Sequence, residues 1–115
     1  MKTKINLKIL EENSEFPTEF IDWFVEKYGD KTVNVWEVID YLKAYKIWNI
    51  PMYQLFEHFK LSGSYEDWYN IDQLHCKGNF KNGERYGKWE WWHGNGQLEW
   101  VENYKENGEL IKTIV

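Results

Sequence analysis

The segment Asn82–Gly108, with the sequence NGERYGKWEWWHGNGQLEWVENYKENG, decides the fold class of this chain. Polar residues alternate with aromatic and aliphatic ones along it, and Asn-Gly pairs interrupt the alternation at 82–83, 95–96 and 107–108. Asn and Gly adopt positive φ at little cost, so such pairs between alternating runs are strong signals of β-hairpin turns. The segment therefore predicts antiparallel strands joined by short turns.

The same pattern occurs earlier in the chain at an offset of 24 residues. A repeat of this length decides the architecture, because each copy is one supersecondary unit. The next turn slips by one residue, since Asn82-Gly83-Glu84 recurs as Asn107-Gly108-Glu109. The matched residues are Gly63 with Gly87, Trp68 with Trp92, Gln73-Leu74 with Gln97-Leu98, Asn79 with Asn103, Phe80 with Tyr104, and Lys81 with Lys105. Strands are expected near 65–70, 73–81, 86–93, 97–105 and 109–115.

Period-two alternation assigns the aromatic residues of this region to sheet faces. Trp89, Trp91 and Trp100 are expected on one face, where helices cover them and Trp100 belongs to the core. Trp68 and Trp92 then lie on the other, more exposed side. In the earlier copy the corresponding apolar face holds Leu74, Cys76 and Phe80, and in the later copy Leu98, Trp100 and Tyr104.

The first half of the chain has helical periodicity instead. A short strand, or alternatively a helical turn, is expected over 4–10. The expected helices are 17–28, which starts after Ser14 or its neighbours and stops at Gly29, then 35–46 with Asn34 as its cap, and 51–60 after a break at 49–51. The overall prediction is an α+β fold: a short strand and two to three helices packed on a C-terminal antiparallel meander. The boundary is expected between 1–62 and 63–115, within one compact domain.

The hairpin segment resembles a known family. The run from Gly83 to Leu98, followed by Asn103-Tyr104 and Gly108, is similar to the MORN-repeat variant described as antitoxin-like in bacteria. The resemblance covers about 63–110, most closely from 78 onward, and leaves the helical half unassigned. It implies hairpin repeats that serve as a scaffold or binding surface, and an antitoxin-like role.

Composition and charge narrow the classes of function. The formal net charge of −5, with no excess of basic residues in either half, argues against nucleic-acid binding. No stretch approaches the roughly 20 apolar residues of a membrane span, and Met1–Leu10 does not resemble a signal peptide. One Cys cannot form an internal disulfide, which fits a reducing compartment. We expect a cytoplasmic protein.

No residue pattern indicates catalysis or a cofactor. His75-Cys76 are adjacent in an expected strand, so their side chains point to opposite faces and cannot work as a pair. His58, His75 and His93 lack the spacing of metal ligands, so no metal site is expected. The sequence therefore predicts a protein without enzymatic activity and without a cofactor.

The high aromatic content, 19% of the chain, is the strongest functional signal. Exposed aromatic residues mark interaction surfaces, and the expected partner-binding residues are Trp68, Tyr69, Tyr86, Trp92 and His93. The favoured function is sequestration or inhibition of a protein partner; its most specific form is a phage or mobile-element inhibitor of a bacterial defence or toxin protein. Alternatives are a carbohydrate- or small-ligand-binding module using Trp faces, and a homo-oligomer formed through the edge strand 109–115. A monomer or weak homodimer is expected.

Overall fold

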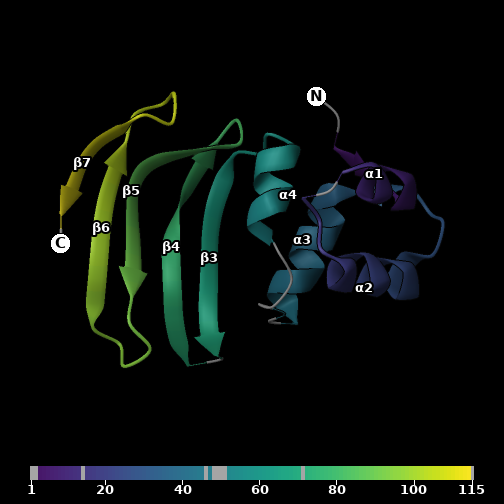
Figure 1. Cartoon of the computed structure of the whole chain (residues 1–115), viewed down its shortest axis with the longest axis horizontal. Coiled ribbons are helices and arrows are strands. Elements are labelled where there is room, and N and C mark those ends of the chain that lie inside the picture. The colour runs from purple at the N-terminus through teal and green to yellow at the C-terminus, as the bar shows by residue number, and fades with distance from the viewer. Residues whose placement is uncertain (1–2, 14, 46, 48–51, 71, 115) are drawn as a thin grey trace. The chain divides into compact units, whose positions relative to one another are not determined.

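The computed structural model of the protein describes residues 3–13, 15–45, 47, 52–70 and 72–114 (Figure 1). The predicted α+β fold class is confirmed: a short strand and several helices precede a five-stranded antiparallel sheet. The chain divides into two compact units, Met1–Leu55 and Phe56–Val115. Among the described residues, no helix has the length and apolar character needed to cross a membrane.

The first unit begins with strand β1 (Lys4–Ile5), which pairs antiparallel with β2 (Val33–Asn34). The short strand expected over 4–10 is two residues long, and the alternative expected there, a helical turn, follows it as helix α1 (Leu7–Glu12). Asn6 explains the change from strand to helix, because its side chain accepts a hydrogen bond of 3.0 Å from the Ile9 amide. An Asn in this capping role starts a helix where simple alternation predicts a strand.

Helix α2 (Thr18–Tyr28) confirms the helix predicted over 17–28. Pro17 occupies its N-cap position, while Ser14 lies outside the described residues. Gly29 ends the helix with φ 64°, a left-handed conformation that glycine adopts without strain.

Helices α3 (Val35–Ala44) and α4 (Met52–His58) correspond to the other two predicted helices. The cap of α3 is Asn34, as expected, and its side chain accepts from the Trp36 amide at 2.9 Å. The predicted break at 49–51 lies outside the described residues. The hydrophobic core of this unit consists of Ile5, Leu10, Phe16, Phe20, Phe24, Val35, Val38, Ile39, Leu42, Met52 and Leu55.

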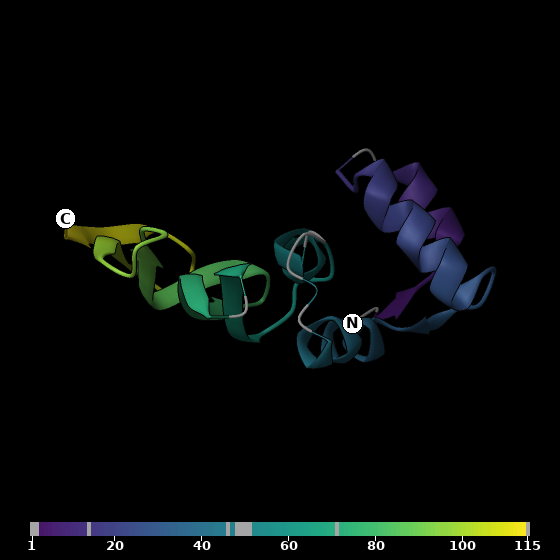
Figure 2. The same ribbon diagram turned by 90° about the horizontal axis from the view of Figure 1, so that it is seen from below.

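The second unit is built around a sheet in which each strand neighbours the next in the chain. Figure 2 shows this sheet viewed along its strands, as a single layer. Its strands agree with the prediction to within about two residues, the usual uncertainty of strand ends. They are β3 (Gly63–Asn70), β4 (Gln73–Lys81), β5 (Glu84–Trp92), β6 (Leu98–Tyr104) and β7 (Leu110–Ile114).

The pairing register confirms the 24-residue repeat in three dimensions. Hairpin β3–β4, the first repeat, pairs Gly63 with Phe80, and hairpin β5–β6, the second repeat, pairs Gly87 with Tyr104. Each later pair in the second repeat lies 24 residues beyond its counterpart in the first. Even the irregularity recurs, because the register shifts after Asp67 in the first repeat and after Trp91 in the second.

The one-residue slip between the repeated turns has a geometric origin. Asn82 and Gly83 have φ values of 52° and 82° and form a two-residue turn between the paired Lys81 and Glu84. The turn with Gly108 contains one more residue, and its ends join through a 2.8 Å hydrogen bond from the Lys105 amide to the Glu109 carbonyl. The extra residue lies in the loop, so the strands keep their repeat.

Trp89 is the centre of the sheet's core. Its side chain is fully buried, its ring contacts those of Tyr65 and Phe80, and its Nε1 donates to the Asn79 carbonyl at 2.9 Å. Gly78 permits this position, because a Cβ there would overlap the indole. The expectation that Trp100 also belongs to the core is wrong, since 38% of that residue is exposed.

The boundary between the units differs from the sequence-based boundary at 62/63. Phe56 belongs with the sheet, because its ring stacks on Phe80 at 5.0 Å and meets Tyr65 edge-on at 5.8 Å. Phe59 and Leu61 are also buried. The C-terminal end of α4 and the residues after it thus supply apolar side chains to the second unit.

Candidate functional site

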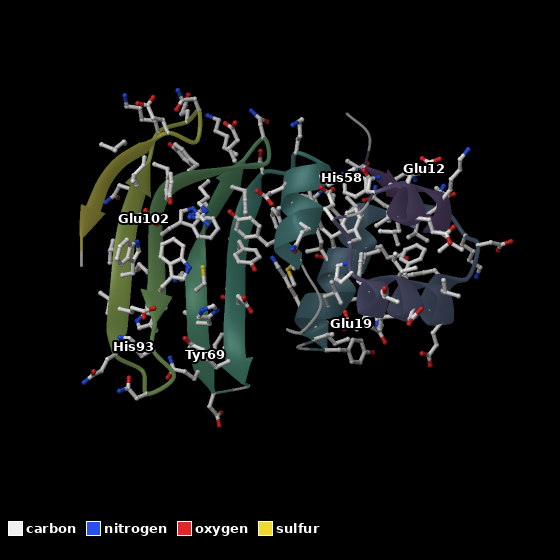
Figure 3. All side chains as sticks on the ribbon, viewed as in Figure 1. Glu12, Glu19, His58, Tyr69, His93 and Glu102 are labelled. Carbon is white, nitrogen blue, oxygen red and sulfur yellow. The ribbon has the colours of Figure 1, made fainter. Side chains whose placement is uncertain are left out.

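Four of the five expected partner-binding residues, Trp68, Tyr69, Trp92 and His93, lie at one end of the sheet. Tyr69 and His93 occur together there (Figure 3), and the Tyr69 hydroxyl donates to the Trp92 carbonyl at 2.9 Å. The Tyr69 ring also contacts His75 at 4.6 Å. Tyr69 is 48% exposed, and the side chain of His93 pairs with that of Glu99 at 3.4 Å.

Tyr86 is separate from this group. It lies six residues before Trp92 on β5, which corresponds to about 20 Å along a strand. Tyr86 is 40% exposed, and the Lys81 ammonium lies 5.4 Å from the centroid of its ring. Because the five expected residues divide between the two ends of β5, they do not make one surface.

The expected faces of Trp68 and Trp92 cannot be obtained from alternation. Both residues are half-buried, and each follows a shift in pairing register, with Trp68 opposite Leu74 and Trp92 opposite Leu98. A bulge of this kind interrupts the alternation of side chains between the two faces. A period-two count from Trp89 therefore does not assign them to a face.

A different cluster occurs on the second repeat. The guanidinium carbon of Arg85 lies 5.4 Å from the ring centroid of Trp89, 5.2 Å from that of Trp91 and 5.5 Å from that of Tyr104. These are cation–π distances, at which the ring quadrupoles attract the positive charge. The cluster joins β5 to β6, and Glu102 marks its position in Figure 3.

Hydrogen bonds fix the polar side of this cluster. Arg85 Nη1 donates to the Tyr104 hydroxyl at 2.7 Å, and that hydroxyl donates to Glu102 Oε1 at 2.9 Å. The guanidinium also forms an ion pair with the same carboxylate oxygen at 3.7 Å. The three side chains thus hold one another in place, and the charges of Arg85 and Glu102 offset each other.

Burial raises the pKa of the Tyr104 hydroxyl, while the hydrogen bond from Arg85 acts in the opposite direction. The phenol therefore keeps its proton at neutral pH and can donate it to Glu102.

Trp100 extends this cluster toward solvent. It pairs with Trp91 across β5 and β6, so the two indoles share the face that carries Arg85. With Trp91 half-buried and Trp100 38% exposed, the face is a partly open aromatic surface. We call Arg85, Trp91, Trp100, Glu102 and Tyr104 the open face.

Comparison of the chain with protein-family models, with curated proteins and with solved structures finds no match. The geometry of the open face is therefore the basis on which a function can be inferred.

The open face was only partly visible in the sequence. Alternation placed Trp91 and Trp100 together, but it gave Arg85, Glu102 and Tyr104 no functional role. The sequence did contain a signal for the position of Arg85, because a two-residue Asn-Gly turn pairs Arg85 with Phe80. This pairing puts Arg85 on the aromatic face at the start of β5.

Cys76 and His75, which were considered for catalysis or metal binding, lie close to the carboxylate of Asp67. Cys76 is buried, and desolvation, followed by the nearby Asp67 carboxylate, raises the pKa of its thiol to about 12. His75 Nδ1 lies 3.4 Å from Asp67 Oδ2. Within the part of the chain that the structure describes, no three His, Cys, Asp or Glu side chains are grouped so as to hold a metal ion.

Proposed function

We propose that this chain is a non-catalytic protein-binding module that sequesters or inhibits a macromolecular partner through the open face. The observation that carries the proposal is the exposure of Trp100 beside Trp91 and Arg85 on one sheet face. Trp, Tyr and Arg are the side chains that most often anchor protein interfaces. Here all three occur in one cluster.

The electrostatics of the face support a protein partner. A partner that covers Arg85 also covers Glu102, with which it is already paired, so no unpaired charge is buried. The hydrogen bonds through Tyr104 hold the two side chains before the partner arrives. Less conformational entropy is then lost on binding.

The proposal in its most specific form is an inhibitor of a bacterial defence or toxin protein, encoded by a phage or another mobile element. Its support is the resemblance of residues 63–110 to antitoxin-like MORN repeats, with the small size and net charge of −5. We also propose a cytoplasmic location, in keeping with a single Cys that is buried.

Affinity capture from bacterial lysate, followed by mass spectrometry, tests this function. Trp100→Ala should abolish capture of a stoichiometric partner, because it removes the exposed anchor. Tyr86→Ala is the matched control, since Tyr86 is 40% exposed but lies on the opposite face from Arg85 by alternation. Tyr69→Ala tests the group formed by Tyr69, Trp92 and His93.

Loss of the partner with Trp100→Ala alone supports the open face. Loss with Tyr69→Ala or Tyr86→Ala, but not with Trp100→Ala, rejects this face as the contact surface. No captured protein from a folded sample rejects the protein-binding function, and a screen of sugars and nucleotides by thermal shift would follow.

A further inference from the structure

The first repeat shows what covers the face of such a hairpin. Phe56, near the end of α4, stacks on Phe80 and meets Tyr65 edge-on, as described above. Its neighbours Phe59 and Leu61 are buried as well. The aromatic face of the first repeat is therefore covered by a short helical segment, and one of its rings packs against side chains of both strands.

In the second repeat a different side chain occupies the position that corresponds to Phe56; we call this position the seat. Twenty-four residues beyond Tyr65 and Phe80 are Trp89 and Tyr104, and the group in contact with both is the Arg85 guanidinium. Arg85 thus takes the place that Phe56 has in the first repeat.

The equivalent positions also differ in exposure. Cys76 in the first repeat is 5% exposed, whereas its counterpart Trp100 is 38% exposed. The helical segment lies over one copy of the hairpin, whereas Trp100 of the other copy is exposed.

The turns show the same contrast. At Gly83 a Cβ would lie 3.3 Å from the Phe56 carbonyl oxygen and 2.8 Å from Lys60 Cα, so the helical segment rests directly on this turn. At Gly108, the corresponding turn residue, a Cβ would instead lie 3.0 Å from the Glu84 side chain. A flexible side chain fills the space that a helix backbone occupies in the first repeat.

We infer that the open face of the second repeat receives an α-helical segment of the partner, with an aromatic side chain packed against Trp91 and Trp100 beside Arg85, as Phe56 packs against Tyr65 and Phe80 in the first repeat. The inference rests on the proposed function and specifies the partner's chemistry: a short amphipathic helix with large apolar residues three positions apart, like Phe56 and Phe59. Arg85 would keep its hydrogen bond to Tyr104 and its ion pair with Glu102, while Trp100 would be covered.

A helix-stabilised peptide of this chain's own segment 52–62, MYQLFEHFKLS, is the probe. A lactam between Gln54→Lys and His58→Asp lies on the side of the helix opposite Phe56, because residues advance about 100° each along a helix. The labelled full-length protein is titrated with the peptide, and the indole NMR signals of Trp91 and Trp100 are recorded. A peptide with Phe56→Ala is the matched control.

The expected result is saturable shifts of the Trp91 and Trp100 signals, with affinity reduced more than about tenfold by Phe56→Ala in the peptide, as for an interface anchor. Arg85→Ala in the protein should weaken binding, because it leaves the Glu102 carboxylate without its ion-pair partner beneath the helix. Absence of shifts, shifts confined to other signals, or equal binding of the two peptides would overturn the inference.

The two proposals can fail separately. A partner captured through Trp100 that is not displaced by the peptide would keep the binding function and reject the helix as the occupant. A peptide that binds the open face, with no partner captured from lysate, would support the helix as the occupant of the open face and reject the cellular function as proposed.

Discussion

Replacement of Gly78 by Ala is the sharpest test of how this sheet is packed. The added Cβ would stand 2.6 Å from Cγ of Trp89 and nearer still to Cδ2 and Cε2. Carbon atoms in good contact are about 3.5–4.0 Å apart, so the ring or the strand must move by about 1 Å or more. Trp89 is fully buried, and its ring already contacts those of Tyr65 and Phe80.

The cost follows from the two ways of removing the overlap. If the indole stays and the backbone yields, overpacking costs about 1–3 kcal/mol. If the indole leaves, the loss of its burial and of its hydrogen bond to Asn79 approaches the roughly 3–5 kcal/mol of a Trp→Ala truncation. We expect Gly78→Ala to lower the free energy of unfolding by about 2–4 kcal/mol, between these limits.

The assay is urea unfolding followed by circular dichroism, with hydrogen exchange of the Trp89 indole N–H as a local probe. Gly94→Ala is the control, because a Cβ there has no atom within 4 Å. Its free energy of unfolding should stay within about 0.5 kcal/mol of the native value, as for other unremarkable surface sites.

A double-mutant cycle tests whether the loss of stability in Gly78→Ala arises from contact with the Trp89 ring. Once Trp89→Ala has removed the ring, Gly78→Ala should cost little more, which gives a coupling energy of about 2 kcal/mol. Additive costs, or a Gly78→Ala variant as stable as the native protein, would refute the contact between this glycine and the indole.

The thiol of Cys76, with its pKa raised to about 12, should react with iodoacetamide at pH 8 about a thousandfold more slowly in the native protein than in urea; equal rates would contradict its burial. Because the native pKa is raised, protonation of this thiol favours the native state below pH 9. That contribution to the free energy of unfolding is lost as the pH rises toward 12. The Cys76→Ala variant should not show this loss. Asn34→Ala should lower the free energy of unfolding by about 1 kcal/mol, measured by urea unfolding, because the Trp36 amide loses its cap; Asn34→Asp keeps an acceptor and should retain most of it. Arg85→Met should cost about 1–2 kcal/mol in the same assay, since it removes the hydrogen bond to Tyr104 and the cation–π contacts; an unchanged stability would show that the guanidinium adds nothing to the fold.

The sequence was sufficient for the strands because their signals are local. Asn82-Gly83 and Asn107-Gly108 specify turns by backbone conformation, and alternation then follows from the pleat. The repeat at 24 residues predicts the equivalence of the two hairpins. Over 4–10 the sequence left a short strand and a helical turn as alternatives, and the structure has both, because the Asn6 cap starts a helix after two residues of strand.

The candidate site was less predictable because it depends on what covers each face. Nothing in the alternation of Trp89, Trp91 and Trp100 tells that the first is fully buried and the last exposed. That difference arises from the position of Phe56 over the first repeat and of Arg85 over the second. The register shifts before Trp68 and Trp92 likewise have no local sequence signal of their own.

The order of the sheet has a consequence for how the second unit forms. Every ladder joins strands that are consecutive in the chain, from β3 through β7. Each pairing then closes only a turn of a few residues, so little chain entropy is lost before the contacts of that pairing stabilise it. Such low contact order favours rapid folding by successive addition of hairpins, in which the β3–β4 ladder with Phe56 provides a template for the strands that follow.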